Sequence, residues 1–170
     1  MEKGIVILLN GPSSGGKTTL SRNLQKKFPT PLYYTSYDLV EGEMNPYIHR
    51  YALDGEEDFL TVMYTMAKAV SDIGRHIVVD NCFFDNQRIY ELAMEILKDN
   101  PVVLVRVKCP VEELKRREIA RGDRMIGKAE WQNQHITPKD DGAYAVVVDT
   151  HADSSETCAD KIIEVCRAYR

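Results

Sequence analysis

The chain has 170 residues, 44% hydrophobic and 28% charged, with a formal net charge of −4 at pH 7. Its length fits one domain, residues 1–170, and its composition excludes a disordered chain, a collagen-like repeat and a disulfide scaffold. The acidic balance argues against an electrostatic grip on nucleic acid, so we expect a small molecule as the partner.

The longest apolar run, Ile5 to Leu9, is far shorter than the about 20 residues needed to cross a bilayer. It leads into Asn10 and Gly11 rather than into the small-residue cleavage site of a signal peptide. None of the four cysteines belongs to a Cys-x-x-Cys pair. We therefore expect reduced thiols in a cytoplasmic protein with no membrane partner, and a homo-oligomer remains an open possibility.

Short β-branched runs alternate with longer helical patterns along the chain. The predicted strands are Ile5–Leu9, Leu32–Thr35, His76–Asp80, Val102–Val107 and Ala145–Asp149. Apolar residues at helical spacing predict helices over about 59–73, 89–97 and 158–169, and Pro110 suits the first turn of another. Ser154 or Ser155 is a candidate N-cap for the last helix. This alternation predicts an α/β fold with a mainly parallel five-stranded sheet, its first strand central and helices on both faces.

A phosphate-binding loop follows the first strand. It consists of Gly11, Pro12, Ser13, Ser14, Gly15, Gly16, Lys17 and Thr18, a full match to G-x-x-x-x-G-K-[ST]. Its glycines allow consecutive N–H groups to surround a phosphate at the start of the next helix, where Thr19 also lies. Lys17 is expected to reach the β- and γ-phosphates, and the Thr18 hydroxyl to ligate Mg²⁺. The alternative is a glycine-rich turn that matches the pattern by chance. The strand before the loop and the amphipathic helix after it favour the phosphate-binding loop over this alternative.

Two acidic residues stand at strand ends, where parallel sheets bind their ligands. Asp80 closes the third run, as a Walker B acid does, and is expected to hold Mg²⁺ directly or through water. The alternative for Asp80 is a solvated strand end. Asp38 follows the second run and is a candidate general base for an attacking hydroxyl. The alternative for Asp38 is a helix N-cap ahead of Leu39.

Arginines are concentrated further along the chain, in a predicted lid over residues 112–135. Arg117, Arg121 and Arg124 repeat at intervals of four and three, so a helix would present them on one face. Such a face would close over ATP and neutralise charge on the transferred phosphoryl group. We expect Arg121 and Arg124 to be catalytic, and Arg117 and Arg121 to contact the nucleotide. The alternative is a solvated basic helix balanced by Glu118 and Asp123.

The P-loop, the strand-end acid and the arginine lid together resemble small-molecule and nucleotide kinases of the P-loop NTPase fold. The string from Glu118 to Arg124, followed by Gly127, Ala129 and Gln132 and then by Val148-Asp149-Thr150, resembles the chloramphenicol phosphotransferase-like family. That resemblance implies transfer of the γ-phosphoryl group of ATP, with Mg²⁺, to a hydroxyl of a small molecule. It also implies Asp38 as general base, Lys17 and Thr18 at the phosphates and Mg²⁺, and Arg121 and Arg124 in the lid.

The stretch between Asp38 and Asp80 is expected to line the acceptor pocket. Candidates there are Asn45, Tyr47, His49, Arg50, Tyr51, Phe59 and Tyr64. A nucleoside, a sugar acid or an antibiotic would each suit Asp38 as base. Alternatives to this activity are a nucleotide-binding switch with no phosphorylated acceptor, a nucleoside or nucleotide kinase, and a kinase of a nucleotide-sugar or of RNA ends. The acidic composition disfavours RNA as the substrate.

Overall fold

Strands and helices alternate along residues 2–40, 55–84, 87–122 and 125–169, the part of the chain that the computed structural model describes. The strands are β1 (Val6–Asn10), β2 (Leu32–Ser36), β3 (His76–Asn81), β4 (Val102–Lys108) and β5 (Val146–Asp149). The helices are α1 (Lys17–Lys27), α2 (Tyr37–Leu39), α3 (Gly55–Asp72), α4 (Gln87–Ile96), α5 (Val111–Arg121), α6 (Lys128–His135) and α7 (Ser155–Arg167), with the 3₁₀ helix η3 (Asp141–Ala143) before β5.

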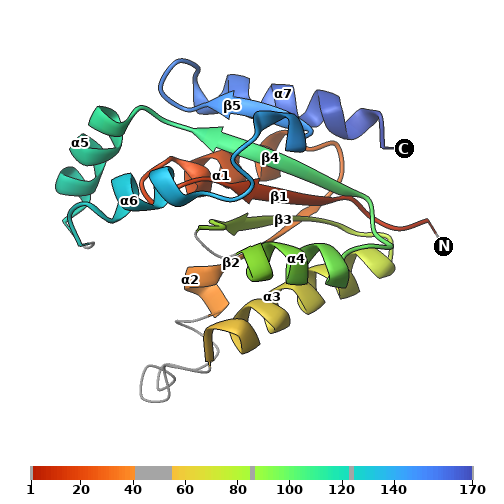
Figure 1. Ribbon diagram of the computed structural model, residues 1–170. Helices are drawn as coiled ribbons and strands as arrows, with labels where there is room; N and C mark the ends of the chain where they lie inside the picture. Colours follow the sequence, from red (N-terminus) through yellow and green to blue (C-terminus); the bar gives the residue numbers. More distant parts are fainter. Residues whose placement is uncertain (1, 41–54, 85–86, 123–124, 170) are drawn as a thin grey trace.

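The five strands form one sheet in the order β2-β3-β1-β4-β5, and every pair of neighbours is parallel. The central strand β1 pairs through Val6 with Ile77 of β3 and with Val102 of β4. All strands therefore end at the same edge of the sheet, as the arrowheads in Figure 1 show. The predicted parallel sheet with its first strand at the centre is confirmed.

Helices cover both faces of the sheet (Figure 1). On one face α1 and α7 pack against a core that includes Ile7 and Leu9, and on the other α3 and α4 pack against a core that includes Val6 and Leu8. Because successive side chains of a strand point to opposite faces, a strand buried on both sides must be apolar throughout. This accounts for the unbroken apolar run at the start of the chain.

The predicted elements lie where the patterns placed them, with ends shifted by a few residues. The helix expected from residue 59 begins at Gly55, and the short elements α2 and η3 were not predicted. Ser154 is the N-cap of α7, since its hydroxyl oxygen accepts the Thr157 N–H at 3.0 Å. In the same helix, Cys158 and Cys166 are buried thiols.

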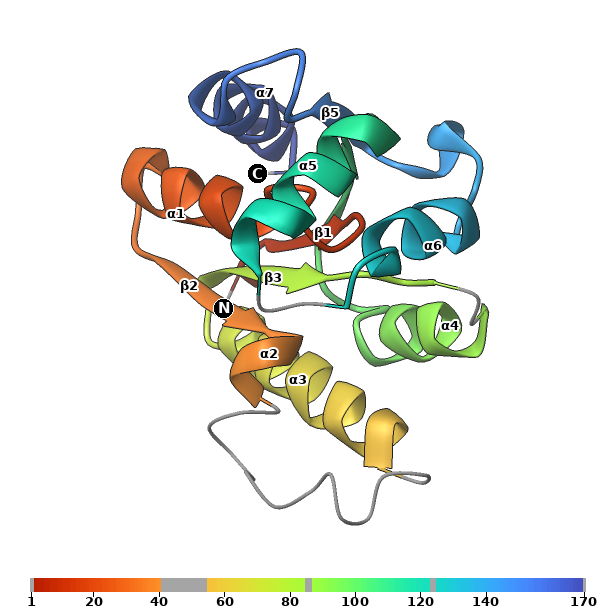
Figure 2. The ribbon, with the colours of Figure 1, turned by 90° about the vertical axis from the view of Figure 1, so that its left-hand side faces the viewer.

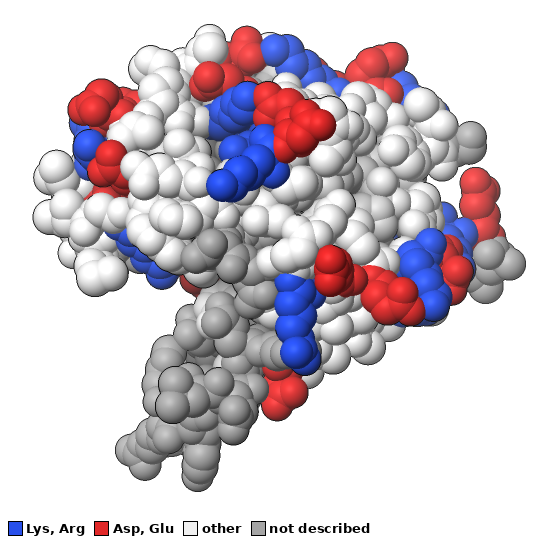
Figure 3. Space-filling view, viewed as in Figure 1, with Lys and Arg blue, Asp and Glu red and all other residues white. Residues whose placement is uncertain are grey.

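The carboxyl edge of the sheet carries the elements that matter for function. Figure 2 looks onto this edge and shows α5 and α6 gathered with the loop after β1, while α2 lies on the β2 side. Basic and acidic side chains are interspersed on the face seen in Figure 3. Among the described residues, none of the helices has the length and apolar character needed to cross a membrane.

Candidate active site

The phosphate-binding loop connects β1 to the first residue of α1. Gly16 precedes the helix with φ of 86°, a left-handed conformation that favours glycine. A Cβ on Gly16 would lie 3.3 Å from the Thr150 hydroxyl oxygen and 3.4 Å from Arg117 Nη1. The left-handed conformation therefore favours glycine here, and the short distances show that Thr150 and Arg117 lie directly beside the loop.

Lys17, Thr18 and Asp80 meet at the start of α1. The Lys17 amine donates to the Pro12 carbonyl oxygen at 2.9 Å and lies 3.7 Å from Asp80 Oδ1. The Thr18 hydroxyl donates to Asp80 Oδ2 at 2.8 Å. Mg²⁺ in phosphate sites takes one or two protein oxygens and completes its shell with phosphates and water. A hydroxyl oxygen beside a carboxylate oxygen fits that requirement. The structure therefore brings together Thr18 and Asp80, the two residues predicted to hold Mg²⁺.

A cavity of about 800 Å³ opens above this cluster. The predicted residues that line it are Ser13, Ser14, Gly16, Lys17, Thr18, Thr19, Asp38, Asp80, Arg117 and Arg121. Gly11, Pro12 and Gly15 shape the loop without lining the cavity. Lining residues that were not predicted for it are Tyr34, Ser36, Tyr37, Leu60, Asn81, Cys82, Phe83, Phe84, Ile89, Lys128, Gln132, Thr150 and Ser155.

Arg117 is held in place on the β4–β5 side of the cavity. Its Nε donates to Glu113 Oε1 at 2.7 Å, and its Nη2 donates to the Thr150 carbonyl oxygen at 3.0 Å. The guanidinium groups of Arg116 and Arg117 lower the pKa of Glu113 to about 2, so this carboxylate stays ionised at neutral pH. The Thr150 hydroxyl in turn donates to the Gly15 carbonyl oxygen at 2.8 Å. Arg117 is thus tied to the phosphate loop through Thr150.

Glu118 joins the two lid helices, although the sequence suggested a surface charge at this position. Its side chain is buried with 1% exposure, and its carboxylate accepts the N–H groups of Gly127 at 2.6 Å and Ala129 at 3.0 Å. These N–H groups belong to the first turn of α6, where a helix leaves its donors unpaired and favours negative charge. The alternative of a solvated basic helix is therefore wrong for this residue.

Asp38 lies within α2, directly after β2, and lines the cavity. The N-cap of this short helix is Ser36, whose hydroxyl oxygen accepts the Leu39 N–H at 3.1 Å. The N-cap alternative for Asp38 is therefore wrong, because a serine two residues earlier takes that role. Asp38 and the phosphate loop reach the same cavity from neighbouring regions of the sheet edge.

Phe59 and Tyr64, two residues expected in the acceptor pocket, do not line the cavity. Phe59 and Tyr64 pack in the core between the sheet and α3, where Tyr64 is fully buried and accepts a hydrogen bond from Asn81. Helical periodicity marks a buried face but does not distinguish a core from a cavity wall. Arg124, Asn45, Tyr47, His49, Arg50 and Tyr51 lie outside the described residues.

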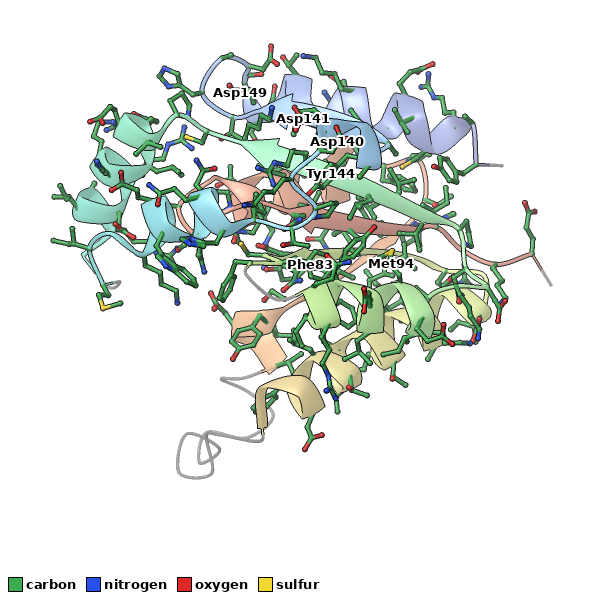
Figure 4. The ribbon with its side chains drawn as sticks, in the orientation of Figure 1. Phe83, Met94, Asp140, Asp141, Tyr144 and Asp149 are labelled. Atoms are coloured by element: carbon green, nitrogen blue, oxygen red, sulfur yellow. The ribbon has the colours of Figure 1, made fainter. Side chains whose placement is uncertain are left out.

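A buried carboxamide positions the segment after β3. Asn10, the last residue of β1, accepts the Phe83 N–H through Oδ1 at 2.8 Å. Its Nδ2 donates to the Thr137 carbonyl oxygen and to the Tyr144 hydroxyl, both at 2.8 Å, and that hydroxyl donates to the Pro138 carbonyl oxygen. Phe83 and Tyr144 lie on the α4 side of the sheet (Figure 4). One residue thus fixes the wall of the cavity to the strand that carries the phosphate loop.

The unpredicted lining residues differ in whether the sequence could have shown them. Gln132 and Thr150 belong to the string that carries the family resemblance, although no role was assigned to either. Leu60, Phe83 and Ile89 carry no signal of their own, because an apolar side chain looks the same in a core and in a cavity wall. Among the described residues, no group of three or more His, Cys, Asp or Glu side chains is arranged to hold a metal ion.

The profile of the family described as "Chloramphenicol phosphotransferase-like protein" matches residues 4–167. The chain belongs to this family. The curated proteins contain no match to the sequence.

Solved structures of P-loop kinases share the fold. The Mycobacterium tuberculosis APS kinase CysC in complex with AMPPNP and APS is 16% identical, with a TM-score of 0.80, covering 98% of this chain and 99% of that one. Shikimate kinase from Acinetobacter baumannii in complex with shikimate is 21% identical, with a TM-score of 0.67 and coverage of 99% and 96%. The Deinococcus radiodurans tunicamycin resistance protein is 18% identical, with a TM-score of 0.71 and 94% of each chain covered.

Proposed function

We propose that this member of the chloramphenicol phosphotransferase-like family transfers the γ-phosphoryl group of ATP to a hydroxyl of a small molecule. The observation that carries the proposal is that Asp38 lines the same cavity as Lys17 and the rest of the phosphate loop. A carboxylate at this position can accept the proton of an attacking hydroxyl. The structural role of helix N-cap does not account for Asp38, because Ser36 is the N-cap. The family and the P-loop kinase fold support the same chemistry.

In this proposal the phosphate loop and α1 hold ATP by its phosphates. N–H groups at the start of α1 surround one phosphate, while Lys17 reaches the β- and γ-phosphates. Thr18 and Asp80 would hold Mg²⁺, which supplies charge neutralisation on the phosphate oxygens when bound. Arg117 contacts the nucleotide from the β4–β5 side, and Arg121 stabilises negative charge on the group in transfer. Arg124 is proposed for the same role on sequence grounds alone.

Asp38 acts as general base on the acceptor. The hydroxyl gives its proton to the Asp38 carboxylate as its oxygen forms a bond to the γ-phosphorus. The bond between that phosphorus and the β–γ bridging oxygen breaks, and the electron pair leaves with ADP. A positioned general base typically contributes about 10²–10⁴ in rate.

The acceptor is a small hydroxylated molecule with apolar surface near its hydroxyl. The cavity wall on the β2–β3 side is formed mainly by aromatic and aliphatic residues, namely Tyr37, Leu60, Phe83, Phe84 and Ile89. Asn81 and Asp38 add polar groups there. We place the reaction in the cytoplasm, a proposal that the four free thiols support.

A screen of hydroxylated metabolites, nucleosides and antibiotics, chloramphenicol included, with labelled ATP tests the activity. For the product-forming acceptor, Asp38→Asn should lower the rate by about 10²–10⁴. The substitution keeps the shape of the side chain but cannot take a proton, so MgATP affinity and thermal midpoint should stay unchanged. The matched control is Asp99→Asn, an exposed residue between α4 and β4, at the opposite edge of the sheet from the cavity.

Two results would contradict the proposal. Full activity in the Asp38→Asn variant, with a lowered thermal midpoint, would make Asp38 a structural residue. If no acceptor is phosphorylated and a slow ATP hydrolysis is indifferent to Asp38, the chain is a nucleotide-dependent switch instead.

A further inference from the structure

The peptide group between Pro12 and Ser13 is held from both sides. Its carbonyl oxygen accepts the Lys17 amine at 2.9 Å, and its N–H donates to Gln132 Oε1 at 2.7 Å. The two partners are far apart in the sequence, because Gln132 comes from the lid helix α6. Figure 2 shows α6 beside the loop that follows β1. The lid helix is thereby fastened directly to the phosphate loop.

The orientation of the Gln132 carboxamide follows from this bond. A backbone N–H only donates, so the atom it meets must be the carboxamide oxygen, and the nitrogen must point elsewhere. The side chain is buried with 5% exposure and lines the cavity. Among the described residues, the Gln132 side chain makes one hydrogen bond, the bond that Oε1 accepts from Ser13. Nε2 has no protein partner and is not fully enclosed, so it is accessible from the cavity. Nε2 therefore keeps two N–H donors that no protein group takes up.

The position of Lys17 indicates where these donors lie relative to the phosphates of ATP. In a phosphate loop the backbone surrounds the α- and β-phosphates, and the lysine amine reaches the β- and γ-phosphates. The Lys17 amine and the Gln132 carboxamide bond to the same peptide group of the loop, so Gln132 lies beside the part of the loop that Lys17 also reaches. Lys128, one turn earlier on α6, lines the same cavity.

We propose that Gln132 binds the γ-phosphoryl group of the nucleotide through its Nε2 donors while its Oε1 holds the lid helix on the phosphate loop. The proposal rests on the nucleotide site of the proposed function and adds a contact that ADP cannot make. Its geometry is prepared in advance, because burial and the Ser13 bond already fix a side chain that would otherwise lose rotamer freedom on binding. Gln132 thus distinguishes ATP from ADP at the lid.

The one tryptophan of the chain provides a local signal for binding. Trp131 precedes Gln132 on α6, packs edge-on against Phe84 with ring centres 5.3 Å apart, and stacks on His135. Phe84 itself lines the cavity. Trp131 emission should therefore respond to nucleotide, and calorimetry can supply the affinity independently of that response.

The test compares the affinities of MgAMPPNP and MgADP in the wild type, Gln132→Glu and Gln132→Met. Glutamate can still accept the Ser13 N–H but has no N–H to donate, whereas methionine loses both functions at similar volume. Hydrogen bonds to charged groups are worth enough that each variant should weaken MgAMPPNP by about 10- to 100-fold more than it weakens MgADP. The control is Gln134→Met, an exposed residue of the same helix, which should leave both affinities unchanged.

The outcomes separate this inference from the proposed function. If the wild type binds neither nucleotide, the nucleotide site itself is refuted and both proposals fail. If the wild type binds both and the variants weaken them equally or not at all, Gln132 only holds the lid and the γ-phosphoryl contact is wrong. Should Gln132→Met lower the thermal midpoint too far for binding studies, the uncharged Gln132→Leu replaces it, because Gln132→Glu also adds a negative charge that would by itself repel the γ-phosphoryl group.

Discussion

The two sides of the cavity are built in different ways. On one side, hydrogen bonds join the phosphate loop and the groups that follow β4 and β5, from Lys17 to Pro12 and from Arg117 to Thr150. Thr18, at the start of α1, also donates to Asp80 at the end of β3. On the other side, after β2 and β3, the wall is mostly apolar, with Asp38 and Asn81 among aromatic and aliphatic side chains. The strand order places these two sides on opposite flanks of β1.

This difference indicates how the work of the site is divided. Phosphate has one shape and a large charge, so it is best met by donors fixed before binding, which need no rearrangement during the reaction. A small organic acceptor is selected by the shape of an apolar wall together with a few placed polar groups. We therefore expect changes on the first side to alter nucleotide binding and rate, and changes on the second side to alter which acceptor is used.

On the nucleotide side, the largest effect is expected from the lid arginines. Arg121→Ala should lower turnover by about 10²–10³ with little change in the KM for ATP, because its charge is needed mainly in the transition state. Arg117→Ala should instead weaken nucleotide binding by about tenfold, since Arg117 is held in place by Thr150 and Glu113. Steady-state kinetics and calorimetry measure the two separately.

Arg116→Ala is the matched control for this series. Its side chain is 69% exposed, pairs with the same Glu113 and does not line the cavity. Activity and affinity should stay within about a factor of two of the wild type, as for most exposed substitutions. A loss at Arg116 as large as at Arg121 would mean that the whole basic helix contributes charge, and the assignment of individual lid arginines would be wrong.

The fold and the nucleotide side could be predicted because their signals are local. Most strands are short runs rich in apolar β-branched residues, and the phosphate loop is a fixed pattern within eight residues, from Gly11 to Thr18. Arg117 and Arg121 follow from helical spacing once the loop is recognised. Connection rules for parallel strands then place β1 at the centre of the sheet and the loop at its edge.

The acceptor side could not be predicted in the same detail because it depends on contacts between distant residues. Asn10 meets Tyr144 across 134 positions of sequence, and no pattern around either residue announces that bond. Ser36, rather than the candidate Asp38, is the N-cap of α2. Which of the two residues caps the helix depends on where the helix begins, and the sequence does not specify that residue. Phe59 and Tyr64 show the helical period of a buried face, yet the face they share belongs to the core.

A smaller effect, on stability, is expected at Asn10. Asn10→Leu is similar in volume but leaves the Phe83 N–H and the Thr137 carbonyl oxygen without their partner, so the free energy of unfolding should fall by about 2–3 kcal/mol. Denaturant unfolding measures the change. Asn133→Leu, on a less buried position of α6, should change it by about 0.5 kcal/mol or less. An equal loss in both variants would show that Asn10 does not hold the acceptor wall.

The smallest functional effect is expected at Cys82, which lines the cavity directly after β3. Burial raises the pKa of the Cys82 thiol to about 11 from its ordinary value of 9.0, although the positive charges of Lys17 and Arg106 oppose the shift. The folded protein thus holds this proton more tightly than the unfolded chain does. Its contribution to the free energy of unfolding is complete below about pH 9 and is lost as the pH rises toward 11.

A protonated thiol neither repels phosphate nor attacks a reagent. Cys82→Ser should therefore keep activity within about threefold of the wild type. Iodoacetamide should label the native protein at pH 8 on the order of 100-fold more slowly than a simple thiol, and faster as the pH rises. The other three cysteines are buried, so Cys82→Ser should remove the labelling altogether. Rapid labelling at pH 8 that MgATP does not slow would mean that the thiol is ionised and lies outside the nucleotide site, against the position assigned to it.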